Sequence, residues 1–228
     1  MTHPPIHSFG RRRGRKLKPG RQALLDELLP RLRIDLPVGG ALLDPATLFA
    51  PGARAVWLEI GFGAGEHLAA QAIRHPEIGF IGCEPYVNGV VALLARVREA
   101  GLTNVRILPG DARPLLERLA PASIARGFVL FPDPWPKRRH RKRRLLRGAF
   151  LDLAGRALAP GAELRLASDD PGYVAEMLER LPGHPAFRWT ATRPADWRIR
   201  PPDQAETGYE AWAIAEGRQP AYLTFRRR

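Results

Sequence analysis

Apolar residues recur along this chain with two alternating spacings. From residue 55 onward, short apolar runs bounded by glycine, proline or acidic residues predict strands, and apolar positions three or four residues apart predict helices between them. The predicted strands are Ala55–Ile60, Gly79–Cys83, Asn104–Leu108, Gly127–Phe131, Glu163–Ala167, Phe187–Thr192 and Ala221–Phe225. The predicted helices are Glu66–Arg74, Val87–Val97, Leu115–Leu119, Leu145–Leu158 and Tyr173–Leu181. Because strands and helices alternate, we expect an α/β fold with a mostly parallel sheet and helices on both faces.

The first 53 residues follow a different pattern. Residues 1–21 contain seven Lys or Arg and no acid, which predicts a disordered basic arm and leaves residues 22–228 as one domain. Leucines at positions 24, 25, 28, 29 and 32 share one face of a predicted helix. Residues 36–53 are rich in Pro, Gly and Ala and are expected to form a loop.

Composition and charge narrow the choice of partner. The chain has 228 residues, of which 45% are hydrophobic, enough for a core, and a formal net charge of +13. That charge favours an anionic partner such as nucleic acid, whereas no apolar run reaches the roughly eighteen residues that a membrane span needs. A single cysteine, Cys83, excludes an internal disulfide and a cysteine-based zinc site. We expect a cytoplasmic protein without a metal or a membrane contact, monomeric or, as the alternative, dimeric.

A glycine-rich turn follows the first strand of the predicted sheet. In such sheets ligands bind at the carboxyl ends of the strands, and Gly61, Gly63 and Gly65 would allow the backbone to approach one closely. The spacing is G-x-G-x-G, and the third glycine of the dinucleotide pattern G-x-G-x-x-G would fall on Glu66. A carboxylate at that helix N-terminus would repel a pyrophosphate, so the turn favours a ligand without phosphates.

Acidic residues accompany the ends of three successive strands. Glu59 lies in the first strand next to the turn, Glu84 follows the second strand, and Asp111 follows the third. A carboxylate after the second strand is suited to a ribose diol, and Asp111 could accept a hydrogen bond from an adenine amino group. This arrangement resembles the S-adenosylmethionine site of class I methyltransferases, in which Glu59, Gly61, Gly63, Glu84 and Asp111 would bind the cofactor.

A proline-rich loop follows the fourth strand. Three prolines in Phe131–Lys137 restrict the backbone around Asp133 and Trp135, and seven of the eight residues 137–144 are Lys or Arg. A rigid carboxylate beside a flat ring suits binding of a heterocycle, and the cations suit phosphates. Trp135 is interpreted either as a stacking partner for an unstacked base or as a core aromatic beneath the loop.

The same loop carries a resemblance to a known family. The run Phe131–Lys137 with His140 and Lys142–Arg144 closely resembles the bacterial tRNA (guanine-N7-)-methyltransferases. Further segments share the resemblance, which extends from the glycine turn to the C-terminus: Leu58–Gly63, Gly82–Glu84, Gly110–Ala112, Ala167–Asp169 and Thr207–Glu210. It implies a Rossmann-like class I methyltransferase that uses S-adenosylmethionine and acts on guanine 46 in the variable loop of tRNA.

The resemblance also implies roles for individual residues. Four acids would contact S-adenosylmethionine or line its pocket: Glu59, Glu84, Asp111 and Asp133. Asp133 would be the catalytic residue. Four residues would bind the substrate nucleotide: Lys137, Asp169, Thr207 and Glu210. Five cations would bind RNA: Arg139, Arg141, Lys142, Arg143 and Arg144.

Two other functions and one departure stay open. The Asp-Pro-x-aromatic loop also suggests an amino-group nucleic-acid methyltransferase, and the charge alone would suit a non-catalytic RNA-binding module. Family members often carry cations where this chain has Gly208 and Trp212. Either two cations are simply missing, or Trp212 packs on a neighbour and Gly208 allows a close backbone approach.

Overall fold

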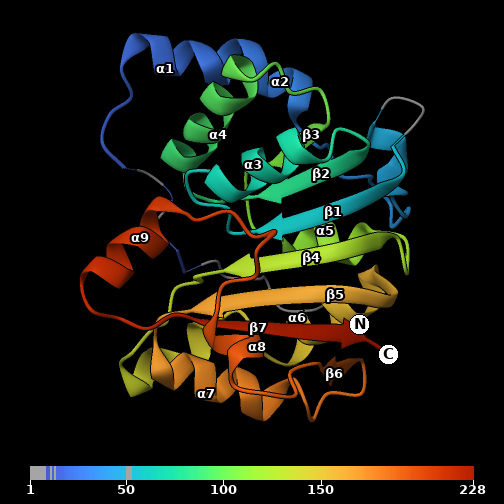
Figure 1. Ribbon diagram of the computed structural model, residues 1–228. Helices are drawn as coiled ribbons and strands as arrows, with labels where there is room; N and C mark the ends of the chain where they lie inside the picture. The colour runs from blue at the N-terminus through green and yellow to red at the C-terminus, as the bar shows by residue number, and fades with distance from the viewer. Residues whose placement is uncertain (1–8, 11, 13, 50–52) are drawn as a thin grey trace.

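A seven-stranded sheet runs through the middle of the molecule (Figure 1). The computed structural model describes residues 9–10, 12, 14–49 and 53–228. The strand order is β3-β2-β1-β4-β5-β7-β6. Strands β1–β5 are parallel to one another, and β7 is antiparallel to both β5 and β6. The strands are β1 Ala55–Ile60, β2 Ile78–Cys83, β3 Val105–Leu108, β4 Ile124–Leu130, β5 Leu158–Ser168, β6 Phe187–Trp189 and β7 Ala221–Arg227. The predicted α/β class with a mostly parallel sheet is confirmed.

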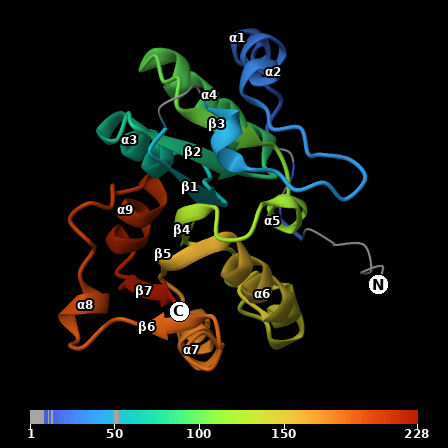
Figure 2. The same ribbon diagram turned by 90° about the vertical axis from the view of Figure 1, so that its right-hand side faces the viewer.

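Helices flank the sheet on both sides. Figure 2 shows α3 and α9 on one side and α5 and α6 on the other. The α-helices are α1 Pro19–Ala23, α2 Leu29–Leu32, α3 Glu66–Arg74, α4 Val87–Glu99, α5 Arg113–Arg118, α6 Gly148–Ala157, α7 Pro171–Arg180, α8 Ala195–Arg198 and α9 Gly208–Ala215. A π-helix, η1 (Leu24–Leu28), joins α1 to α2, and two 3-10 helices are η2 (Pro45–Leu48) and η3 (Arg138–Arg143).

Two large apolar cores and a smaller one around Phe128 and Tyr222 lie between the sheet and its helices in the described part of the chain. One large core unites the sheet with α5, α6 and α7 through fully buried side chains such as Leu115 and Tyr173. The other large core packs the leucine-rich N-terminal helices, α3 and α4 against β2 and β3 through Leu68, Leu93 and Phe80. Because apolar helices cover both faces, the ends of the strands are left as the place for a polar ligand.

The register of the strands brings the predicted site residues to one edge. Ile60 of β1 pairs with Cys83 of β2, which pairs with Leu108 of β3. The residues that follow these positions therefore leave the sheet side by side. In Figure 1 this carboxyl edge lies at the left, next to α9.

Several boundaries differ from the sequence-based prediction. The helix predicted from Leu145 begins only at Gly148, and β5 begins at Leu158, where that helix was expected to end. The N-terminal arm predicted over residues 1–21 is structured in part, because α1 begins at Pro19 and the backbone N–H of Gly14 donates to Asn88 Oδ1 at 2.9 Å. Residues 1–8, Arg11 and Arg13 lie outside the described residues.

Candidate active site

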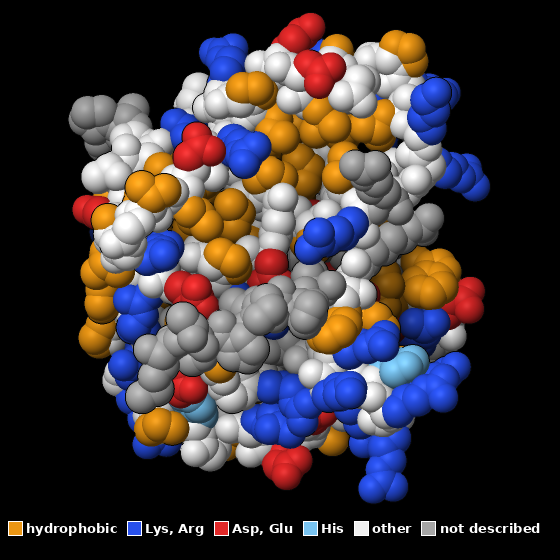
Figure 3. Space-filling view, turned by 180° about the vertical axis from the view of Figure 1, so that it is seen from behind, with side chains coloured by type: hydrophobic (Ala, Val, Ile, Leu, Met, Phe, Trp, Pro, Cys, Tyr) orange, Lys and Arg blue, Asp and Glu red, His pale blue; other side chains and the backbone are white. Residues whose placement is uncertain are grey.

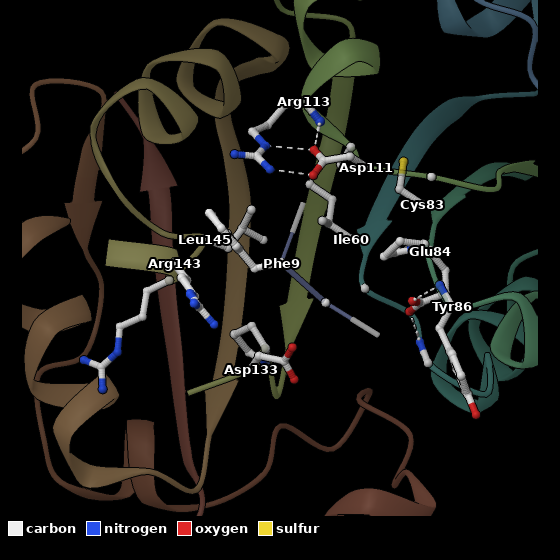
Figure 4. Close-up of a pocket in the computed structure, with 18 of the residues that line it drawn as sticks. Phe9, Ile60, Cys83, Glu84, Tyr86, Asp111, Arg113, Asp133, Arg143 and Leu145 are labelled. Carbon is white, nitrogen blue, oxygen red and sulfur yellow. Dashed lines mark hydrogen bonds and ion pairs between the residues drawn. The ribbon is translucent and has the colours of Figure 1, made fainter. Parts of the chain in front are cut away.

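A cavity of about 510 Å³ opens at the carboxyl ends of β1–β4 (Figure 4). Each strand contributes to its wall: Gly61 follows β1, Glu84 follows β2, Asp111 follows β3, and Asp133 follows β4. The residues 142–145 that follow the proline loop close another side. The volume is in the range of cavities that enclose small organic ligands, roughly 300–1,000 Å³.

The glycine turn forms the floor of the cavity with backbone that few other residues could adopt. Gly61 and Gly63 have φ angles of 75° and 55°, in the left-handed region. A Cβ atom added at either glycine would meet no atom within 4 Å, so both face open space in the cavity wall. Gly65 differs, because a Cβ there would lie 2.7 Å from the side chain of Leu93. The third glycine therefore serves the packing of α3 on α4.

Glu84 braces this turn. Its Oε2 accepts a hydrogen bond from the Gly63 N–H at 2.8 Å, and its Oε1 accepts one from the Tyr86 N–H at 2.9 Å. Burial raises the pKa of Glu84, the nearby charges of Asp133 and Glu59 add to the rise, and the two backbone N–H groups oppose it. The carboxylate thus shapes the cavity and also lines it.

Asp111 is held by its near neighbour Arg113. The guanidinium donates from Nε to Oδ1 at 2.8 Å and from Nη2 to Oδ2 at 2.6 Å, and the Arg113 N–H donates to Oδ1 at 2.9 Å. Burial alone would raise the pKa of Asp111, but the hydrogen bonds and charge of Arg113 outweigh it and lower the pKa. Figure 4 shows this pair across the cavity from Glu84.

Glu59 is not part of the cavity wall. Its Oε2 lies 2.7 Å from Nδ1 of His67 on α3, and both side chains are buried. The structure therefore brings Glu84, Asp111 and Asp133 together at the cavity. Glu59 instead forms a buried pair with His67 of α3. His67 lies in the core, and its pairing with Glu59 was not predicted from the sequence.

The proline loop holds two strained residues around Asp133. Phe131 and Trp135 have φ angles of 51° and 44°, which cost of order 1–3 kcal/mol each in residues that carry a Cβ. Surrounding bonds maintain this shape, among them Phe131 N–H to Ala167 O at 2.8 Å. Asp133 lies at the mouth of the cavity and is exposed to solvent. The protein atoms around its carboxyl group still remove part of its hydration, which raises its pKa.

Arg144 differs from the rest of the basic run, because it holds the proline loop from below. Its side chain is only 1% exposed, and its contact with RNA stays a prediction. The guanidinium donates to Pro134 O at 2.7 Å and to Glu176 Oε2 at 2.6 Å, and it lies 4.7 Å from the centre of the Tyr173 ring. Tertiary packing against α7 decides this, because that helix supplies the acid and the ring.

The rest of the basic run stays at the surface. Arg139, Arg141 and Lys142 are exposed on η3 or just beside the cavity, and Lys142 lines it. Lys and Arg side chains gather at the lower right of Figure 3, on the side where the strands end. Arg143 places its guanidinium 4.9 Å from the centre of the Trp135 ring. Trp135 lines the cavity, so it is not a core aromatic.

The four residues predicted to bind the substrate nucleotide have different surroundings. Lys137 is exposed directly before η3, and Thr207 caps α9 by accepting the Glu210 N–H at 3.2 Å. Asp169 pairs with Arg218 at 2.8 Å. Glu210 is fully buried against the Tyr222 hydroxyl and fixes α9 to β7, and its contact with the substrate stays a prediction.

Several residues of the cavity wall were not predicted from the sequence. Phe9 and Gly10 reach its wall from the N-terminal segment, and a Cβ at Gly10 would lie 3.8 Å from Asp133 Oδ2. The prediction for residues 1–21 used only their positive charge, so it gave no role to the aromatic residue Phe9. Arg113, the partner of Asp111, stands only two residues away in the sequence.

The fold and this cavity define the class of protein. The sequence model of a family described as "Putative methyltransferase" matches residues 53–221. Among solved structures, the 16S rRNA methyltransferase KamB has a TM-score of 0.56 at 18% identity, covering 79% of this chain and 95% of that one. A structure described as an antibiotic-related methyltransferase has a TM-score of 0.53 at 16% identity, over 87% and 97% of the two chains. The protein is a class I, S-adenosylmethionine-dependent methyltransferase.

Closer relatives define the family. A tRNA (guanine-N(7)-)-methyltransferase of Rhodospirillum rubrum is 54% identical, over 96% of this chain and 87% of that protein. One from Roseobacter denitrificans is 46% identical, over 99% and 97% of the two chains. The chain belongs to the tRNA (guanine-N7-)-methyltransferase family.

The described part of the chain also bears on metals and membranes. No group of three or more His, Cys, Asp or Glu side chains in it could hold a metal ion. No helix in the same part is long and apolar enough to cross a lipid bilayer.

Proposed function

We propose that this protein transfers a methyl group from S-adenosylmethionine to N7 of a guanine in tRNA, at position 46 of the variable loop. One observation carries the proposal. The cavity that would hold the methyl donor opens beside Asp133, and the exposed cations Arg139, Arg141 and Lys142 stand at the same edge. A base can therefore enter the cavity while its phosphates meet positive charge.

The cavity fits the cofactor in its donor set. Gly61 and Gly63 leave open space in which a ligand can approach the backbone closely. The turn that contains them lacks the glycine spacing of dinucleotide-binding loops. Glu84 accepts backbone hydrogen bonds but keeps lone pairs that can accept from a ribose diol. Asp111 likewise keeps acceptor capacity beyond its bonds to Arg113. When bound, S-adenosylmethionine supplies an electrophilic methyl carbon with a neutral thioether as its leaving group.

Asp133 has the position required of the catalytic residue. Guanine N7 attacks with a lone pair and carries no proton, so the protein needs no base at that atom. The purine becomes cationic as the new N–C bond forms, and an ionised carboxylate at the mouth of the cavity stabilises that charge. The same carboxylate can accept hydrogen bonds from the guanine N1–H and 2-amino group and so align the base.

The residues outside the cavity would position the RNA. Lys137, Arg139, Arg141 and Lys142 are exposed and suited to phosphates. Arg143 covers Trp135 and would set the ring for stacking on an unstacked base. The division into a basic arm of residues 1–21 and a methyltransferase domain of residues 22–228 belongs to the same proposal, as do a cytoplasmic location and a monomeric state.

Product analysis tests the reaction. The protein is incubated with labelled S-adenosylmethionine and bulk tRNA, and the tRNA is digested to nucleosides. We expect N7-methylguanosine, which makes the RNA alkali-labile at the modified position. An N6-methylated base would favour the amino-group alternative. Binding of tRNA without any labelled product would favour the RNA-binding module.

Calorimetry tests the cofactor residues. Removing a hydrogen bond to a charged group costs roughly 1.5–3 kcal/mol. Glu84→Ala and Asp111→Ala should therefore weaken binding of S-adenosylmethionine, each by roughly 10- to 150-fold. Unchanged affinity in both variants would contradict the placement of the cofactor.

A further inference from the structure

Helix α9 buries its acidic residue and exposes its large apolar residues. Its acidic residue, Glu210, is fully buried, whereas Tyr209, Trp212 and Ile214 are 41%, 47% and 49% exposed. A surface helix ordinarily turns its apolar residues inward and its charges outward. Single exposed apolar residues are common, but adjacent large ones on one short helix indicate a surface that meets something.

This orientation of α9 is held by specific bonds. Gly208 N–H donates to Glu66 Oε2 at 2.6 Å, and a Cβ at Gly208 would lie only 3.1 Å from Glu66 Oε1. The Glu210 carboxylate accepts from the Tyr222 hydroxyl and lies 3.5 Å from Arg200. These contacts fix the helix at its N-terminus and along its inner face, so its outer face is presented in one orientation. Gly208 thus allows the close backbone approach that we considered from the sequence.

A row of rings connects this outer face to the cavity. Phe131 lines the cavity, and its ring centre lies 5.4 Å from that of Tyr209. The ring of Tyr209 lies 5.6 Å from that of Trp212, its neighbour at i+3 on the helix. Arg218, paired with Asp169 at 2.8 Å, lies 4.6 Å from the centre of the Trp212 ring. The indole is thus held against a cation that is itself paired with an acid.

The chemistry of this row matches a nucleobase. The rings are flat and partly exposed, a guanidinium accompanies them, and the chain carries a net charge of +13. Aromatic side chains beside cations bind single-stranded nucleic acid by stacking, which is tolerant of base identity. Because the row begins at the wall of the cavity, a nucleotide next to the one inside the cavity would come closest to it.

Resting on the proposed function, we propose that Tyr209 and Trp212 form a stacking platform for an unpaired nucleotide that flanks the target guanine. Trp212 stacks on that base, and Arg218 holds the indole in position. The platform lies outside the cavity and takes no part in the methyl transfer. It adds affinity for tRNA in which the target guanine has an unstacked neighbour.

Two matched variants test the platform. Trp212→Ala should weaken binding of tRNA by roughly 5- to 150-fold, the range measured for losing one stacked base. Trp212→Phe, which keeps a flat ring, should retain most of the affinity. Ile214→Ala is the control, because Ile214 is equally exposed on the same helix but offers no flat face. Melting temperature and binding of S-adenosylmethionine should match wild type in all three.

A second arm identifies the bound group. Transfer RNA with an abasic residue on either side of the target guanine should bind wild type more weakly at one of the two positions. Trp212→Ala should then show no further loss with that tRNA. An effect of Trp212→Ala no larger than that of Ile214→Ala would overturn the proposal, and so would fully additive losses, which would indicate a partner other than a base. Tighter binding with a steeper salt dependence in Trp212→Arg would show instead that a cation is missing here. Failure of the proposed function would appear separately, as absence of N7-methylguanosine with wild type.

Discussion

The two sides of the cavity are built in opposite ways. On the side formed by β1–β3, the acidic groups are already bonded within the protein: Glu84 to the backbone at Gly63 and Tyr86, and Asp111 to Arg113. On the side formed by the proline loop, Asp133 is exposed at the mouth of the cavity, and burial is what raises its pKa. The acids of the cofactor side are thus held in place by bonds within the protein, whereas Asp133 stands where a substrate would enter.

The backbone shows the same difference. The left-handed residues on the cofactor side are glycines, which adopt that conformation without strain. On the substrate side they are Phe131 and Trp135, which store strain that the surroundings must maintain. The substrate side therefore depends on support from outside the loop, which the buried cation Arg144 supplies by donating to Pro134 O.

The largest expected effect follows from removing that support. Arg144→Ala should lower the free energy of unfolding by about 3–5 kcal/mol, because it removes a buried guanidinium that donates hydrogen bonds to Pro134 O, Gly172 O and Glu176. Arg139→Ala is the control, since an exposed cation of the same run should change stability by no more than about 0.5 kcal/mol. Denaturant titration measures both. Equal stability of the two variants would remove the distinction between buried and exposed cations.

The next effect concerns Asp133. Asp133→Asn should reduce turnover by roughly 100-fold or more, because a preorganised group that opposes developing charge is lost. Affinity for tRNA should change by only a few fold, since Asp133 would act mainly in the transition state. Asp152→Asn on the surface of α6 is the control and should retain wild-type turnover. Turnover near wild type in Asp133→Asn would mean that the substrate side has been misplaced.

A smaller effect concerns the exposed cations. Each phosphate neutralised contributes about 0.7–0.9 to the slope of log affinity against log salt. Replacing Arg139, Arg141 and Lys142 together by Gln should therefore flatten that slope by about two units for tRNA. Binding of S-adenosylmethionine should not change. A slope identical to that of wild type would show that the run is only solvated surface.

The smallest effect is a pH dependence on the cofactor side. The raised pKa of Glu84 means that the folded protein holds this proton more tightly than the unfolded chain. Its contribution to stability is therefore greatest below the ordinary value of 4.5 and declines as the pH rises through the folded pKa. Glu84→Gln cannot ionise, so its unfolding free energy relative to wild type should rise across that range. A difference that is flat from pH 4.5 upward would contradict the buried environment of this carboxylate.

Some features of the site could be predicted because they depend on local chain order. Glu84, Asp111 and Asp133 each follow a strand, and parallel strands deliver such positions to one edge. The glycine turn was predictable for the same reason. Glu210 and Arg144 were predicted to bind the substrate nucleotide and RNA, and both are buried. Nothing in their immediate neighbours distinguishes them from exposed charges, because their partners come from distant elements.

The order of strands and helices, the glycine turn, the rigid proline loop and the excess of positive charge can all be read from the amino-acid sequence. These features depend on apolar spacing, on backbone restriction and on composition, all of which act over a few residues. Which charged groups face the cavity depends on the folded chain. Glu59 pairs with His67 and Arg144 pairs with Glu176, because a buried charge requires a partner, and folding brings these partners together from distant parts of the chain. The exposure of Trp212 likewise follows from the way α9 packs on the rest of the molecule.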